Sequence, residues 1–183
     1  MKKLICLFLI LLMFSLTACA KQDGFDTDYT VTTPDAAGSG PTVADYGCDL
    51  PDGFTAADGI PGMYQSPDYP DDSSNFYMTC GDADPYFANY DASILEAAFS
   101  RSLTQQTGTE VAVTVDSLEY CTVDSLPAYR AQLHYTVDGL ALRQLVVCVN
   151  ADYCYTFTWT QVGEADWMDA FCTSADSLWF KLL

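Results

Sequence analysis

The feature that most constrains the fold is a run of alternating side chains between residues 128 and 160. Three segments, 128–137, 140–149 and 153–160, alternate apolar with polar or small side chains, as half-buried strands do. The turn signals Asp138-Gly139 and Asn150-Ala151-Asp152 separate them. Because short turns of this kind join antiparallel neighbours, we predict an antiparallel sheet with one polar face.

The faces of these strands also predict their register. A turn centred on Ala151 places Cys148 opposite Cys154 and gives the apolar residues of both strands a common face. That face meets Leu133 and its alternating neighbours only if the preceding turn has three residues, centred on Gly139, with a bulge. A two-residue Asp-Gly turn would instead place Leu133 opposite Gln144, so the three-residue turn is our prediction.

Helical spacing is clearest over residues 91–107. Asp91 is a suitable N-cap and Gly108 is placed to end the helix. The apolar stripe at three- and four-residue spacing is expected to face the core, and its members are Ile94, Leu95, Ala98, Phe99 and Leu103.

Shorter signals complete the domain. A second helix is predicted over residues 164–174, carrying Trp167, Met168 and Phe171 inward, whereas residues 178–180 fit either a strand or a continuation of that helix. Further strands are predicted near residues 53–55, 61–66, 75–80, 110–115 and 118–123. This order of elements predicts an α+β fold, an antiparallel β-sheet flanked by helices.

The N-terminus resembles a bacterial lipoprotein signal. Lys2-Lys3 precedes an apolar run over residues 4–14, and Leu16-Thr17-Ala18-Cys19 follows at the distance of a cleavage site. Eleven apolar residues are too few to span a bilayer as a helix. The resemblance implies that residues 1–18 are removed and that Cys19 becomes the lipidated N-terminus. We therefore expect a membrane-anchored protein on the extracytoplasmic face.

Charge and composition divide the rest of the chain. Residues 19–46 are rich in Gly, Pro, Asp, Thr and Ser without a period, which predicts a flexible tether, and 47–183 form one domain. Removing residues 1–18 takes away two lysines and no acid, so the net charge moves from −18 to −20. No basic run offsets it, which argues against a nucleic-acid partner.

The predicted domain also resembles the PsbP/DcrB-like group of compact antiparallel sheets flanked by helices. The residues behind this are Gly53-Phe54, Leu126-Pro127-Ala128, the segment 153–159, and Phe171 with Ser174. The resemblance spans residues 50–180. It implies a sandwich-like fold and no shared catalytic set, although six cysteines in the domain depart from it.

Those six cysteines are a candidate disulfide framework. An even number in an exported domain favours bridges, and we expect at least two. Six cysteines allow fifteen connectivities, and the predicted register indicates only one pair, Cys148 with Cys154. The alternative is that the cysteines are buried free thiols. The six are Cys48, Cys80, Cys121, Cys148, Cys154 and Cys172.

Motifs for catalysis or tight metal binding are missing from the sequence. His134 is the only imidazole, and no Gly-x-Ser-x-Gly, His-Glu-x-x-His, Cys-x-x-Cys or phosphate loop accompanies it. We therefore predict no catalytic residue, no metal ligand set and no cofactor. Asp71-Asp72 and Asp82-x-Asp84 leave weak binding of a hard cation open, and with it a calcium-stabilised domain.

Aromatic side chains suggest a binding role. Tyrosines near predicted turns suit contact with a peptide or glycan, although packing on the sheet or beside it is the favoured explanation. The leading hypothesis is a lipid-anchored, non-enzymatic envelope protein with a binding or structural role. Its partners would be the membrane, through the lipid, and an envelope protein, peptide or glycan. The candidate contact residues are Tyr64, Tyr69, Tyr77, Tyr86 and Tyr90.

Overall fold

The computed structural model describes residues 40–183, so the predicted signal peptide, Cys19 and the predicted tether up to residue 39 lie outside the described residues. One sheet has seven strands in the order β2-β3-β4-β8-β7-β6-β5, every neighbouring pair antiparallel, and β1 pairs with β9. The predicted α+β class is confirmed. The strands are β1 (Val43–Gly47), β2 (Thr55–Ala56), β3 (Met63–Gln65), β4 (Asn75–Asp82), β5 (Thr114–Val123), β6 (Leu126–Val137), β7 (Leu140–Asn150), β8 (Tyr153–Val162) and β9 (Trp179–Leu182), and the helices are η2 (Phe87–Asn89), α2 (Ala92–Thr107) and α3 (Met168–Asp176).

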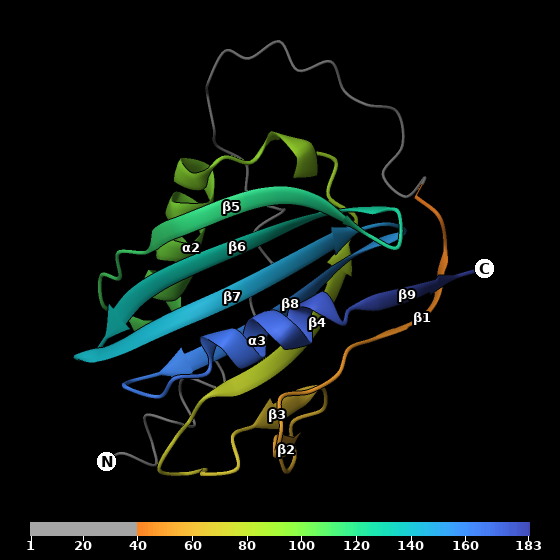
Figure 1. Ribbon diagram of the computed structural model, residues 1–183. Helices are drawn as coiled ribbons and strands as arrows, with labels where there is room; N and C mark the ends of the chain where they lie inside the picture. The colour runs from red at the N-terminus through yellow and green to blue at the C-terminus, as the bar shows by residue number, and fades with distance from the viewer. Residues whose placement is uncertain (1–39) are drawn as a thin grey trace, which may run out of the picture.

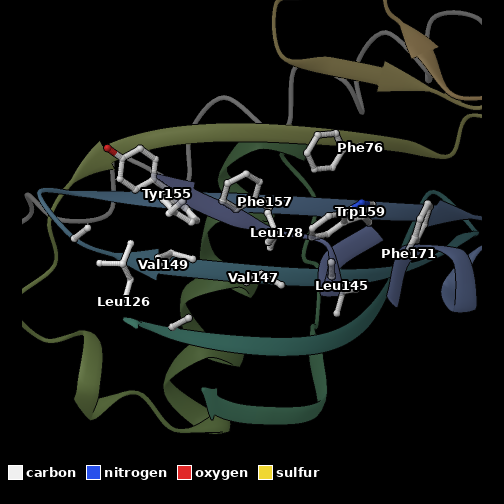
Figure 2. Close-up of a cluster of buried hydrophobic side chains, with 14 of the residues drawn as sticks. Phe76, Leu126, Leu145, Val147, Val149, Tyr155, Phe157, Trp159, Phe171 and Leu178 are labelled. Atoms are coloured by element: carbon white, nitrogen blue, oxygen red, sulfur yellow. The ribbon is translucent and has the colours of Figure 1, made fainter. Parts of the chain in front are cut away.

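The two long helices cover opposite faces of the seven-stranded sheet (Figure 1). On one face Phe171 of α3 packs among Trp159, Phe157 and other buried side chains (Figure 2). On the other face α2 packs over Ala131, Val146 and their neighbours. The prediction of one polar sheet face is therefore wrong for the central strands, because both of their sides are core.

The β6–β7 turn corrects the predicted register. Val137 pairs with Leu140 and Leu133 lies opposite Gln144, so the turn has two residues and not three. Asp138 and Gly139 have φ of 51° and 79°, the positive values that a type I′ hairpin turn needs at both central positions. The three-residue turn was predicted in order to place all apolar residues on one face. A sheet covered on both faces removes that requirement.

The segment before β5 was predicted as a separate strand over residues 110–115. Val111 and Val113 are buried as the alternation suggests, but their backbone N–H groups donate to the side chains of Thr104 and Ser100 on α2. The helix thus satisfies backbone groups that a neighbouring strand would otherwise bond. The predicted strand 118–123 is the second part of a longer β5, which has an irregularity between Val115 and Ser117.

Helix α2 has the predicted bounds and caps. The Asp91 carboxylate accepts a hydrogen bond from the Ile94 N–H at 2.8 Å, and Gly108 ends the helix with φ of 70°. Leu95, Phe99 and Leu103 are buried. Ile94 is 43% exposed, so its place in the predicted core stripe is wrong.

The chain ends come together at β1 and β9, which lie side by side (Figure 1). Tyr46 on β1 stacks on Phe180 of β9 with ring centroids 5.8 Å apart, and both pack against the α3-side core. Residues 43–46, which composition assigned to the tether, are therefore part of a strand. Residues 179–182 form a strand, which decides the alternative left open above.

Candidate functional site

An open cleft of about 1100 Å³ lies at one end of the sheet. Three segments far apart in sequence line it: residues 68–73, the β6–β7 turn, and residues 162–167 after β8. In Figure 1 the β6–β7 turn and the end of β8 lie at the same end of the sheet, on the left. Tyr69, Trp167 and Leu140 supply apolar surface. Its acidic lining residues are Asp68, Asp71, Asp72, Asp138, Glu164 and Asp166, and no Lys or Arg lines it.

Asp72 fixes the wall of this cleft. Its carboxylate accepts hydrogen bonds from the Ser74 N–H at 2.9 Å, the Ser74 hydroxyl at 2.6 Å and the Trp167 indole N–H at 2.7 Å. Partial burial alone would raise the pKa of Asp72, but the hydrogen bonds from Ser74, Trp167 and Ser66 outweigh it and lower the pKa below its usual value. The contact joins two segments that are 95 residues apart.

Two aromatic rings and one hydrogen bond hold the Trp167 side chain in place. Its ring meets Phe54 edge-on at 5.1 Å and stacks on Phe171 at 6.4 Å between centroids. With the indole N–H bonded to Asp72, the side chain has little freedom to turn. Trp167 was predicted to point into the core. The structure leaves it half-buried, at the boundary between core and cleft.

We expect Asp72→Ala to reduce the free energy of unfolding by about 1–3 kcal/mol, because it leaves the Ser74 and Trp167 donors without their acceptor. Since the folded-state pKa is lowered, the stabilisation by Asp72 is complete above the unfolded pKa of about 3.9 and is lost as pH falls through the folded pKa. The difference between wild type and variant should therefore shrink below about pH 4. Urea unfolding over a pH series measures it, with the exposed neighbour variant Asp71→Ala as the control. If the difference in unfolding free energy between wild type and Asp72→Ala grows towards low pH, the role of the ionised Asp72 carboxylate as a hydrogen-bond acceptor is contradicted.

The five candidate tyrosines do not form one surface. Tyr69 lines the cleft, and the Tyr69-Pro70 peptide bond is cis. Tyr77 is buried beside Met63, and Tyr64 packs on Phe76 at 6.0 Å. Tyr86 is 48% exposed, while Tyr90 donates to the Asp84 carboxylate and packs against Tyr129. Tyr77 thus has too little exposed surface for the predicted contact role, and only Tyr69 of the five lies at the cleft.

The Cys148–Cys154 pair is close in space but not as predicted. Cys148 pairs with Thr156 and Cys154 with Asn150, so the two are diagonal and not directly opposite. Their Sγ atoms are nevertheless 2.8 Å apart. All six cysteines of residues 40–183 are free thiols in the structure, so the expected bridges are not present in it and stay a prediction.

His134 lies on β6 and is not among the lining residues of the cleft. Its Nδ1 is 2.9 Å from the Asp116 carboxylate, and both side chains are about half exposed. Between residues 40 and 183, no group of three or more His, Cys, Asp or Glu side chains is arranged to hold a metal ion, so the calcium alternative has no ligand set there. In the same residues no helix is long and apolar enough to cross a membrane.

Comparison with known proteins identifies the class of fold. No family model matches the chain, and no curated protein matches it. Among solved structures, the PsbP protein (CyanoP) of the cyanobacterium Synechocystis sp. PCC 6803 is similar with a TM-score of 0.54 and 15% identity, over 81% of this chain and 98% of that one. The chain thus has an α+β fold similar to that of PsbP, as its sequence resemblance implied.

A second similar structure is LpqN of Mycobacterium tuberculosis, which is described as involved in cell envelope biogenesis. Its TM-score is 0.45 and its identity 13%, over 74% of this chain and 83% of that one. At these identities both comparisons concern the fold alone.

Proposed function

We propose that this protein is a lipid-anchored, non-enzymatic protein of the extracytoplasmic cell envelope that binds a basic peptide segment of a partner in its acidic cleft. The observation that carries the binding role is the lining of the cleft, where six carboxylates face one open space without a basic side chain. Such a surface attracts cations and repels acidic ligands.

The shape of the cleft favours a peptide over a single ion. Its volume of about 1100 Å³ is at the upper end of ordinary ligand sites, and its carboxylates come from three separate segments. Tyr69 and Trp167 add aromatic surface on which the methylene stems of Lys or Arg can pack. A neutral glycan would use the aromatic rings but would gain nothing from the charges.

Two observations support a role without catalysis. Asp72, the most buried carboxylate of the cleft, is occupied as an acceptor of three hydrogen bonds, and its lowered pKa keeps it ionised. An ionised, fully bonded carboxylate is a poor general acid. The single imidazole of the chain, His134, pairs with Asp116 outside the cleft.

Binding is tested with a fluorescein-labelled oligolysine peptide and the full chain in detergent micelles, followed by fluorescence anisotropy. The triple variant Asp68→Asn, Asp71→Asn, Glu164→Gln should weaken binding about ten-fold, from about 0.5 kcal/mol for each partly exposed charge. Affinity should fall as salt is raised.

The matched control is Asp52→Asn, Asp58→Asn, Glu110→Gln, which makes the same change in net charge at exposed residues outside the cleft. If the two triple variants weaken binding equally, net charge alone attracts the peptide, and the proposed binding in the cleft is contradicted. Binding of a neutral oligosaccharide, without binding of the oligolysine peptide, would contradict the proposed basic ligand and favour a glycan.

Anchoring is tested separately. The signal-like segment and Cys19 support it, and Cys19→Ser should move the protein from the detergent phase to the aqueous phase in Triton X-114 partition. Incorporation of labelled palmitate into wild type, and none into the variant, is the direct measurement. Equal partition of both proteins would contradict the lipid anchor and leave the cleft proposal standing.

A further inference from the structure

Two thiols meet on the α2 side of the sheet, close to the end of the β7–β8 hairpin. The Sγ atoms of Cys148 and Cys154 are 2.8 Å apart, well inside the separation of two sulfurs in ordinary contact and longer than the 2.03–2.05 Å of a disulfide bond. Both side chains belong to the core cluster on that face, Cys148 buried and Cys154 partly so. The fold therefore holds the two sulfurs together without a covalent bond.

Hydrogen bonds to the segment 84–90 hold the strands that surround the two thiols. Asn150, which pairs with Cys154, exchanges hydrogen bonds with the backbone of Asp84: its amide oxygen accepts at 2.9 Å and its amide nitrogen donates at 3.1 Å. The Tyr120 hydroxyl donates to the carbonyls of Phe87 and Tyr90, each at 2.9 Å. The segment 84–90 is thus tied to β5 and β7 beside the two thiols.

The two thiols differ in access and in acidity. Cys148 is 3% exposed, whereas Cys154 is half-buried, and its neighbour on β4 is Gly81, which has no side chain to cover it. The hydrogen bond between the two thiols lowers the pKa of Cys154 despite its burial. The same hydrogen bond, together with burial, raises the pKa of Cys148. Cys154 is therefore the thiol that ionises first and the one that an outside reagent can reach.

We propose that Cys148 and Cys154 are a redox pair that exchanges with a small-molecule or protein disulfide and forms an intramolecular bridge between β7 and β8. In the first step the Cys154 thiolate attacks the outside disulfide, which forms a mixed disulfide and releases one thiolate. In the second step the Cys148 sulfur, after losing its proton to solvent, attacks Cys154 Sγ and releases the second thiolate. The two cysteines lose two electrons, and the outside disulfide becomes two thiols.

Two further cysteines of residues 40–183, Cys80 and Cys121, have different surroundings, because both are exposed. Cys80 pairs with Tyr155, so its side chain lies on the opposite face of the sheet from Cys154. Cys80 and Cys121 should therefore form mixed disulfides with the reagent and not the bridge. This difference gives the experiment an internal control.

The full chain is treated with oxidised glutathione, alkylated without reduction and digested with the endoproteinase that cleaves before aspartate. Cleavage at Asp138, Asp152 and Asp166 places Cys148 alone in peptide 138–151 and Cys154 alone in peptide 152–165. We expect the two peptides joined by a disulfide in wild type and in Cys80→Ser. Both peptides alkylated, in a sample in which Cys121 carries glutathione, would overturn the proposal.

The order of attack is tested with the single variants. Cys148→Ser should accumulate glutathione on peptide 152–165, whereas Cys154→Ser should leave peptide 138–151 mainly unmodified. Circular dichroism confirms that each variant is folded before oxidation. The reverse pattern would overturn the assignment of Cys154 as the attacking thiol.

Discussion

Trp159→Ala should lower the free energy of unfolding by about 3–5 kcal/mol. Trp159 has no exposed surface and lies beside Phe76 and Phe157 (Figure 2), with ring centroids 4.9 Å and 6.4 Å away. It donates its indole N–H to the Ser174 hydroxyl at 3.0 Å. The truncation leaves a cavity in the contact between β8 and α3, and the Ser174 hydroxyl keeps only the hydrogen bond that it donates to the Asp49 carbonyl. Because folded domains are stable by only about 5–15 kcal/mol, we expect a large drop in the urea midpoint.

The chain provides a matched control for this truncation. Trp179→Ala makes the same chemical change on β9, where the side chain is 43% exposed, and should cost within about 1 kcal/mol. Unfolding in urea, followed by circular dichroism, compares the two. Equal losses at both positions would contradict the placement of Trp159 at the centre of the core.

Val146→Asp should cost at least about 4 kcal/mol and leave the protein largely unfolded at neutral pH. Val146 has no exposed surface and packs on the α2 side of the sheet among buried hydrophobic side chains. Burial would raise the pKa of the new carboxyl, so the loss should become smaller as pH falls below that raised value and the neutral form is buried.

Thr136→Asp is the control for the added charge. Thr136 lies on the neighbouring strand β6 and is exposed, so the same side chain remains in water there. Thermal unfolding at neutral and acidic pH measures both variants. Tolerance of Asp at residue 146 would show that the α2 face is open to water, as a sheet with one polar face would be.

Local signals in the sequence predicted local structure well. Helix α2 was predicted because its caps and its stripe lie within one segment, and the hairpins β6–β7 and β7–β8 followed from the turn residues between their strands. The error at the β6–β7 turn arose from a non-local assumption. The Asp-Gly pair indicated a two-residue turn, but the prediction set it aside to keep one face polar, and only tertiary packing reveals that α2 and α3 cover both faces.

The candidate site was less predictable for the same reason. Asp71-Asp72 was considered only for weak binding of a hard cation, and Trp167 was predicted as a core residue of a separate helix. Their contact through Asp72 joins residues 95 apart, and no local pattern encodes it. For the cysteines the alternation gave the correct common face, but the turn was centred on Ala151 where the observed register is centred on Asp152, which left the pairing two residues out of register.

The pairing of β1 with β9 has a practical consequence. Val43 at the start of β1 pairs with Leu182 at the end of the chain, and the two strands form a sheet separate from the seven-stranded one. The Leu183 N–H donates to the Thr42 carbonyl at 3.0 Å, so the last residue lies beside the start of β1. A tag fused after Leu183 therefore stands next to the point at which the chain enters this two-stranded sheet, and it would disturb the β1–β9 pairing before it disturbed the seven-stranded sheet.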